Sequence, residues 1–230
     1  GMYQFSFRDG VRTDNASAFL EPAMGRPNLR VETHALISRV LFEGRRAVGV
    51  EYRQGGKLRQ VRCNREVIVA TGAVHTPVML QRSGVGPGAL LQSHGIPVVH
   101  DSPAVGENLQ DHVFTGVTFR TRVPTVNNQL NSWHAVALQG MRYLLTRRGP
   151  LGMGLNQGGA FVSTRPGETR PDSQLYIIPM TFQGLKPGQK KGLRVDKFGG
   201  MTINASPCRP ESRGRIELRS PDPDAQPRIH

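Results

Sequence analysis

The stretch of residues 65–86 constrains the fold of this chain more than any other part of its sequence. Residues 67–69 form a short β-branched run that predicts a fully buried strand. Ala70-Thr71-Gly72-Ala73 follow, and side chains this small let another molecule approach the backbone. Pro77 predicts the start of a helix, which Ser83-Gly84 ends after about two turns. Nucleotide-binding sheets present their ligand in this way, although an ordinary strand-turn-helix connection has the same pattern.

The residues before this stretch predict a strand meander with glycine turns at 43–44 and 55–56. The expected strands are residues 29–33, 36–42, 47–52 and 58–63. After it, we expect a short helix over 88–94, ended by Gly95, and an edge strand over 96–100, where Pro97 has no N–H to donate.

From about residue 112 onward the pattern changes to α+β, with helices packed against one antiparallel sheet. The expected strands are residues 113–121, 173–179, 201–205 and 215–219. Residues 133–146 predict a helix with an apolar side formed by Ala137, Met141, Leu144 and Leu145.

Residues 72–86 resemble the second signature of the glucose-methanol-choline (GMC) oxidoreductases, which are FAD-dependent alcohol dehydrogenases and oxidases. The matching positions, in order, are Gly72-Ala73, Thr76-Pro77, Met79-Leu80 and Ser83-Gly84-Val85-Gly86. Four other segments agree with the family in the same order, namely residues 28–40, 47–52, 105–112 and 209–223. The resemblance covers nearly the whole chain and is choline dehydrogenase-like.

The resemblance implies a mixed α+β and α/β fold with two domains. Residues 1–112 would be part of an FAD-binding, Rossmann-like domain, and residues 113–230 an antiparallel-sheet substrate domain that is incomplete at its C-terminus. The family's Gly-x-Gly-x-x-Gly turn and its catalytic His, with a second His or Asn, have no counterpart in this sequence. We therefore interpret the chain as an internal fragment of a larger enzyme, with no catalytic residue of its own.

The resemblance also assigns the cofactor-binding residues. Ile37 aligns with an aliphatic position whose backbone would contact the adenine of FAD. Ala70, Thr71 and Gly72 would pass beside the ADP half of FAD, where a larger side chain would collide.

A second set of residues is expected on the substrate side or at a hinge. Asn108 and Asp111 would bond backbone where the chain enters the substrate domain. His112 follows Asp111, and an Asp-His pair can orient an imidazole for proton transfer, although a hinge role is favoured. Asn156 would face the active site or serve in a turn.

The implied activity is hydride transfer from the CH–OH group of a small-molecule alcohol to the N5 atom of FAD. The electron acceptor is left open between oxygen, a quinone and a cytochrome. One alternative is a non-catalytic binding or structural domain that keeps the fold, and another is an enzyme that uses nicotinamide in place of FAD.

Composition excludes other classes of function. The net charge is +13, but the arginines are dispersed and lack interleaved aromatics, so a nucleic-acid partner is not expected. The dense basic patch, residues 186–197, is rich in glycine and lacks interleaved aromatics apart from Phe198. No apolar run is long enough for a membrane span, and no His or Cys spacing suits a metal. The two cysteines lie far apart, so a reduced, cytoplasmic state is the default. The location of the parent protein is unknown, because its true N-terminus is expected to lie elsewhere.

Overall fold

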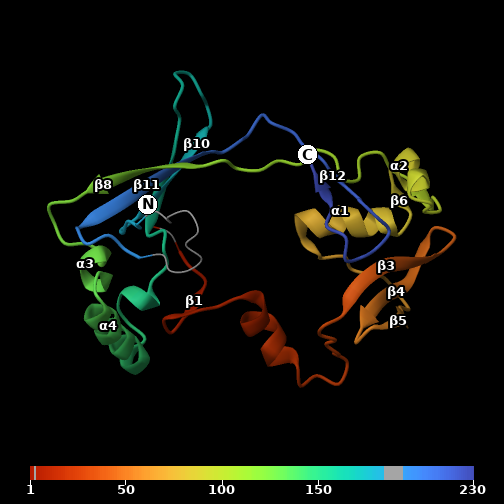
Figure 1. Cartoon of the computed structure of the whole chain (residues 1–230), viewed down its shortest axis with the longest axis horizontal. Helices are drawn as coiled ribbons and strands as arrows, with labels where there is room; N and C mark the ends of the chain where they lie inside the picture. Colours follow the sequence, from red (N-terminus) through yellow and green to blue (C-terminus); the bar gives the residue numbers. More distant parts are fainter. Residues whose placement is uncertain (3, 184–193) are drawn as a thin grey trace. The chain divides into compact units, whose positions relative to one another are not determined.

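The computed structural model describes residues 1–2, 4–183 and 194–230, which form two compact units (Figure 1). Each unit is assembled from two segments that lie far apart in the sequence. The first unit comprises Gly1–Leu29 and His112–Pro210, and the second comprises Arg30–Asp111 and Glu211–His230. Helices and antiparallel strands occur together, which confirms the expected mixed fold class.

The two units do not follow the expected domains 1–112 and 113–230 at either end of the chain. The chain does pass from the second unit to the first at residues 111–112. Residues 1–29, however, group with the later segment, and residues 211–230 return to the earlier one. The sequence pattern does not show which distant segments join the same unit, because this grouping depends on contacts between them. Which unit serves FAD and which serves the substrate stays a prediction.

A three-stranded antiparallel meander lies in the second unit. It consists of β3 (Leu36–Glu43), β4 (Arg46–Gln54) and β5 (Lys57–Arg62), in the order β3-β4-β5. Gly55 and Gly56 turn the chain between β4 and β5 with φ angles of 56° and 75°, which glycine adopts without strain. The meander expected from the sequence is confirmed for these three strands.

Two other expected strands, residues 29–33 and 67–70, are wrong. The first contacts β4 through a side-chain hydrogen bond and not through strand pairing: Nε2 of Gln54 donates to the carbonyl of Thr33 at 2.9 Å. The second has no strand partner within the described part of the chain, and Ile68 is 81% exposed. An apolar run predicts burial, but a strand also needs a neighbour to satisfy its backbone groups.

Helix α1 (Gly72–Arg82) begins at Gly72, five residues before the expected start at Pro77. Pro77 is the sixth of its eleven residues and lies inside the helix, where its missing N–H removes one hydrogen bond to the preceding turn. Val78 and Met79 are buried, as expected. The helix ends where predicted, since Gly84 follows the C-cap with a φ of 87°.

Short elements follow α1. Strand β6 (Val85–Gly86) leads into α2 (Gly88–Ser93), and Gly95 ends that helix with a φ of 68°, which confirms the prediction. Strand β6 pairs in parallel with β7 (His100–Asp101). The strand expected over residues 96–100 is therefore reduced to its last residue.

The C-terminal segment completes the core of the second unit. It forms β12 (Ile216–Glu217) and β13 (Arg228–Ile229), which pair antiparallel, so the strand expected over residues 215–219 is shorter than predicted. Ile216 and Leu218 are buried and cluster with Val78 of α1. Residues more than 130 positions apart thus share one core.

A four-stranded antiparallel sheet forms the first unit's framework and confirms the antiparallel sheet expected after residue 112. Its strands lie in the order β8-β11-β10-β9 (Figure 1). Their bounds are Thr115–Arg120 for β8, Gly158–Val162 for β9, Ser173–Ile178 for β10 and Gly200–Pro207 for β11. In the register, Tyr176 lies opposite Asn204, which lies opposite Gly116, so these three residues share one face.

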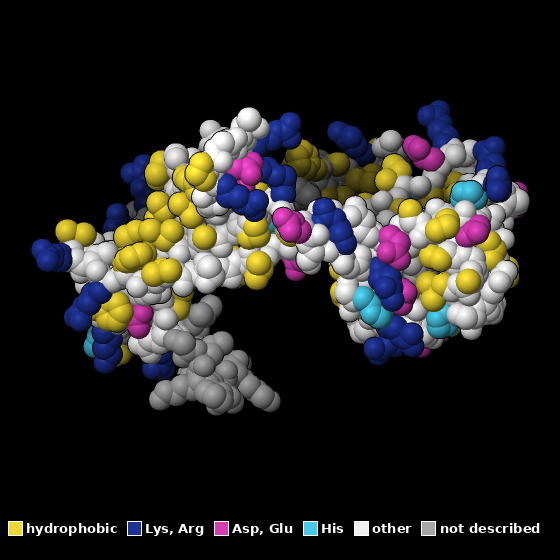
Figure 2. All heavy atoms as spheres, turned by 90° about the horizontal axis from the view of Figure 1, so that it is seen from above, with side chains coloured by type: hydrophobic (Ala, Val, Ile, Leu, Met, Phe, Trp, Pro, Cys, Tyr) yellow, Lys and Arg dark blue, Asp and Glu magenta, His cyan; other side chains and the backbone are white. Residues whose placement is uncertain are grey.

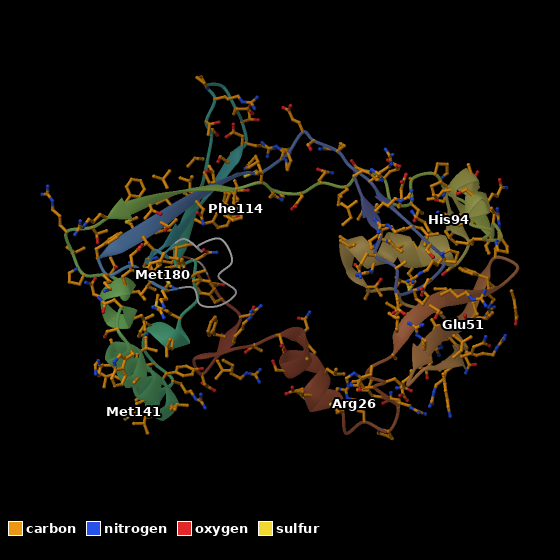
Figure 3. All side chains as sticks on the ribbon, viewed as in Figure 1. Arg26, Glu51, His94, Phe114, Met141 and Met180 are labelled. Carbon is orange, nitrogen blue, oxygen red and sulfur yellow. The ribbon has the colours of Figure 1, made fainter. Side chains whose placement is uncertain are left out.

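Helix α3 (Val126–Leu130) packs on this sheet. Val126 is buried in a cluster with Ile178 and Met180, and Met180 is labelled beside the helix in Figure 3. Asn127 is fully buried, and its Nδ2 donates to Oγ1 of Thr181 at 2.7 Å. The helix is therefore fixed by both apolar and polar contacts.

Helix α4 (Trp133–Thr146) has the predicted bounds, but its apolar side is not packed. Met141, Leu144 and Leu145 are 56%, 71% and 79% exposed. The helix instead uses its other side, where the Tyr143 hydroxyl donates to the Gly10 carbonyl at 3.1 Å. The expectation that this side packs on the sheet was wrong, because periodicity shows which face is apolar and not what covers it.

The remaining elements of the first unit are short. They are β1 (Phe7–Arg8), β2 (Val11–Arg12), the one-turn π-helix η1 (Ala16–Leu20), and the 3-10 helices η2 (Glu21–Ala23) and η3 (Pro150–Gly152).

Candidate functional site

The start of α1 is open, as a ligand-binding edge requires. Thr71 occupies the N-cap position, but its hydroxyl does not cap the helix and lies 3.1 Å from the hydroxyl of Thr76. Ala70, Thr71 and Gly72 are exposed, and a Cβ added to Gly72 would meet no atom within 4 Å. The first N–H groups of a helix lack intrahelical acceptors and carry positive partial charge. The segment therefore suits the approach of a negatively charged group.

Ile37 lies in β3, half-buried, next to an irregularity of the ladder. It pairs with Tyr52, whereas Arg39 pairs with Glu51, so Ser38 is an extra residue that forms a β-bulge. Bulges redirect the local backbone and occur often beside functional sites. The bulge is consistent with the predicted backbone contact of Ile37 with adenine, which stays a prediction.

Ser83 fixes the distance between β3 and α1. Its buried hydroxyl donates to the Met79 carbonyl at 2.6 Å and accepts the Val40 N–H at 2.8 Å. Ile37 and the start of α1 are thus carried by two elements that are bonded together. From the sequence, Ser83 is indicated only as a helix stop and as part of the family signature, and nothing near it in the sequence indicates this role.

Gln81 is a second residue whose role sequence reasoning missed. Its side chain is fully buried, and Nε2 donates to the carbonyls of Val105 and Ile216 at 3.1 and 3.2 Å. Its Oε1 accepts the Leu218 N–H at 2.7 Å. Gln81 therefore bonds the C-terminal segment to α1. The only signal in the sequence is a polar residue directly after the apolar run of the helix.

Asn108, Asp111 and His112 lie where the chain passes between the units. Asn108 has a left-handed φ of 63°, a conformation that asparagine tolerates better than most residues. Next to it, Leu109 and Gly214 exchange both backbone hydrogen bonds, at 2.9 and 2.8 Å. His112 Nε2 lies 3.3 Å from the Cys208 carbonyl. These contacts suit the predicted hinge role, and neither that role nor direct chemistry is tested.

Asn156 lies half-buried in the loop between η3 and β9, in the first unit. Ile37 and Ala70–Gly72 belong to the second unit. The substrate-side role of Asn156 stays a prediction.

Glu51 carries the main buried charge near the meander. It is 6% exposed, and its carboxylate accepts Nε of Arg39 at 3.0 Å and Nε2 of Gln60 at 2.9 Å. The hydrogen bond from Arg39 holds the pKa of Glu51 below its ordinary value, while burial opposes this. Figure 3 places Glu51 on β4.

Glu51 should make stability depend on pH. Because its pKa is lower in the folded chain, ionised Glu51 stabilises the fold above the ordinary carboxyl pKa, and this contribution is lost as the pH falls through the folded value. We expect Glu51→Gln to lower the free energy of unfolding by about 1 kcal/mol at pH 7 and by much less at pH 3. Urea unfolding at both pH values measures this, with exposed Glu43→Gln as the control. An equal loss at both pH values would contradict it.

Among the described residues, no group of three or more His, Cys, Asp and Glu side chains is arranged to hold a metal ion. Likewise, within the described ranges, no helix has the length and apolarity needed to cross a membrane.

Comparison with known proteins identifies the family. Residues 1–114 match the family model described as GMC oxidoreductase. The oxygen-dependent choline dehydrogenase of Burkholderia ambifaria is 37% identical over 220 residues, and that of Pseudomonas putida is 40% identical over 225 residues. The chain belongs to the GMC oxidoreductase family. The resemblance inferred from residues 72–86 is therefore confirmed.

The match to these relatives covers 96% of this chain but only 38% and 39% of theirs. The chain thus spans about two fifths of the length of the curated relatives it matches. The activity, substrates and partners of the whole protein are therefore proposals.

Solved structures agree on the fold. A formate oxidase of Aspergillus oryzae, studied for modification of its FAD, superposes with a TM-score of 0.80 at 26% identity, over 97% of this chain and 42% of that one. A fungal aryl-alcohol oxidase superposes with a TM-score of 0.75 at 24% identity, over 96% of this chain and 44% of that one. Together with the family match, the formate oxidase structure indicates FAD as the cofactor.

Proposed function

We propose that the protein containing this chain is an FAD-dependent oxidoreductase that transfers a hydride from a CH–OH group to the flavin. The observation that carries this proposal is the open start of α1, which lies inside the family signature and has space above Gly72. The family match and the flavoprotein fold support the same activity. They favour it over a non-catalytic domain and over a nicotinamide enzyme.

The residues of this chain fit a role in holding FAD. The uncapped start of α1 would face the negatively charged ADP half, and the exposed Ala70 and Thr71 leave room for it. The backbone of Ile37, next to the bulge in β3, would contact the adenine. When bound, FAD supplies the electron sink that alcohol oxidation requires. The chain's contribution is to orient the cofactor.

We propose that a base outside this chain accepts the hydroxyl proton of the alcohol, as the family resemblance implies. We propose that Asn108, Asp111 and His112 act as a hinge where the chain enters the substrate domain, and that Asn156 lies on the substrate side. The substrate is proposed to be a small-molecule alcohol. We propose oxygen, a quinone or a cytochrome as the electron acceptor, and a cytoplasmic location for the whole protein.

Enlarging Ala70 tests the assignment of the FAD site. We expect Ala70→Leu in the full-length protein to weaken FAD binding about tenfold, because the larger side chain occupies the space assigned to the ADP half. Ala70 is a better position than Gly72, whose φ of 82° would strain any other residue even without FAD.

Flavin absorbance per mole of folded protein, together with an FAD titration of the apoprotein, provides the measurement. Ala89→Leu, at an exposed position of α2 outside the proposed site, is the matched control and should bind FAD normally. Normal FAD loading in a folded Ala70→Leu protein would remove residues 70–72 from the site.

A further inference from the structure

The two ends of helix α1 have different surroundings, although both belong to the family signature. At its start, a Cβ added to Gly72 would meet no atom within 4 Å. At its end, a Cβ added to Gly84 would lie 2.5 Å from the Pro97 carbonyl oxygen, and the Gly84 carbonyl accepts the Val99 N–H at 2.8 Å. The eleven residues of the helix separate the two ends by about 16 Å. The signature therefore joins an open end to a closed end.

Ser83 connects the closed end of α1 to the meander. Lys, Arg, Asp and Glu side chains lie over the surface of the second unit (right in Figure 2), whereas Ser83 is only 6% exposed. A serine hydroxyl has one proton, which Ser83 donates to the Met79 carbonyl at 2.6 Å. The same oxygen atom accepts the Val40 N–H at 2.8 Å. The helix and strand β3 thus share one oxygen atom whose donor and acceptor are both in use.

Val40 uses this acceptor because of its place in the meander. Among the described strands, β3 pairs with β4 alone, so the other edge of β3 has no strand beside it. Val40 is 5% exposed, and its N–H donates across this edge to Ser83. A buried N–H without an acceptor would cost free energy. The bond therefore determines which residue of β3 lies beside the end of α1.

The same register sets the position of Ile37. This residue lies three positions before Val40 on β3, a span of about 10 Å along a strand. The residues proposed to hold the ADP half of FAD thus lie on two elements, with Ile37 on β3 and residues 70–72 at the start of α1. Hydrophobic contact between two elements is non-directional, whereas a hydrogen bond specifies one register.

We propose that Ser83 is a positioning residue for FAD, which sets the affinity for the ADP half from the far end of α1. It holds β3 against the helix in the register that aligns the Ile37 backbone with residues 70–72. Ser83 acts through these residues and not by contact with the cofactor, because its hydroxyl is buried and bonded to Met79 and Val40. The inference rests on the proposed function and adds to it a residue outside the cofactor site.

Ser83→Ala in the full-length protein removes the shared oxygen atom and little volume. We expect the variant apoprotein to bind FAD and ADP about tenfold more weakly, which corresponds to about 1.4 kcal/mol. FMN, which lacks the AMP part of FAD, should bind with unchanged affinity, because the change acts on the adenine side. Isothermal titration calorimetry measures the three affinities.

Two further substitutions vary the hydroxyl itself. Ser83→Thr retains it and should bind ADP within about threefold of the unmodified protein. Ser83→Cys keeps the shape of serine with a weaker hydrogen-bonding group, so it should weaken ADP binding in the same direction as Ser83→Ala. The cysteine variant also provides the measurement if Ser83→Ala does not fold.

Ile216→Val separates positioning from a general loss of stability. Ile216 is 2% exposed and packs with Val78 of α1, so the variant loses one buried methyl group in the same unit. The two hydrogen bonds of the Ser83 hydroxyl stay in place. Ile216→Val should lower the midpoint of urea unfolding, as Ser83→Ala should, but leave the affinity for ADP unchanged.

The outcomes are distinguishable. Unchanged affinity for FAD and ADP in a folded Ser83→Ala or Ser83→Cys protein would overturn this inference. Equal weakening of ADP binding in Ile216→Val, or equal weakening for FMN, would overturn it as well, because the effect would then be one of stability. In each of these cases the proposed function stands if the unmodified protein binds FAD and Ala70→Leu weakens that binding. An unmodified apoprotein that binds neither FAD nor ADP would overturn the proposed function itself.

Discussion

Replacing Gln81 with methionine is expected to destabilise the second unit by about 3 kcal/mol. Methionine has nearly the same length, so the change removes hydrogen bonds without opening a large cavity. It leaves the carbonyls of Val105 and Ile216 and the N–H of Leu218 without their partner in a fully buried place. Each such group costs about 1 to 3 kcal/mol, and local relaxation recovers part of the sum.

Amide hydrogen exchange measures this effect locally. The Leu218 N–H should exchange about 100-fold faster, because each 1.4 kcal/mol corresponds to a factor of ten. The Thr121 N–H, which donates to the Gly199 carbonyl in the first unit, is an internal reference that should not change. Gln92→Met, at an exposed position of α2, is the matched control. Unchanged protection at Leu218 would show that the C-terminal segment does not depend on Gln81.

The second large effect concerns the 230-residue chain on its own. We expect it to bind FAD weakly or not at all, to oxidise no alcohol, and to self-associate. The sequence contains no Gly-x-Gly-x-x-Gly turn for the pyrophosphate, and the resemblance places the catalytic base elsewhere. The apolar side of α4 and Ile68 are exposed, and exposed apolar surface of this kind promotes association.

Sedimentation velocity and flavin absorbance check this expectation. The pair Leu144→Glu and Leu145→Glu should reduce self-association, because it places charge on the exposed side of α4. Gln110→Glu, outside the helix, is the control. A yellow, monomeric preparation that reduces a dye in the presence of an alcohol would show that both the cofactor site and the base had been misplaced.

Local patterns predicted the local structure well. The bounds of α4, the glycine turn between β4 and β5 and the ends of α1 and α2 follow from capping, turn chemistry and periodicity, which act within a few residues. The expected strand over residues 67–70 failed for a different reason. Its sequence is suited to a strand, but no described segment pairs with it, and a partner is not a local property.

The candidate site shows the same limit. Glycine and small residues predicted the open start of α1, because small side chains let another molecule approach the backbone. The roles of Ser83 and Gln81 depend on Val40, Ile216 and Leu218, and nothing near them in the sequence indicates those partners. The roles of polar residues that are buried against distant segments therefore cannot be predicted from a single sequence.

Residues 211–230 belong to the second unit, and this sets the order in which the two units are completed during synthesis of the protein. A ribosome releases residues 30–111 before residues 112–210, but the cluster around Val78 lacks Ile216 and Leu218 until about a hundred more residues have emerged. The four-stranded sheet, whose last strand ends at Pro207, is complete before then. The second unit is therefore the one whose core is completed last, although most of its residues are synthesised before residues 112–210 of the first unit.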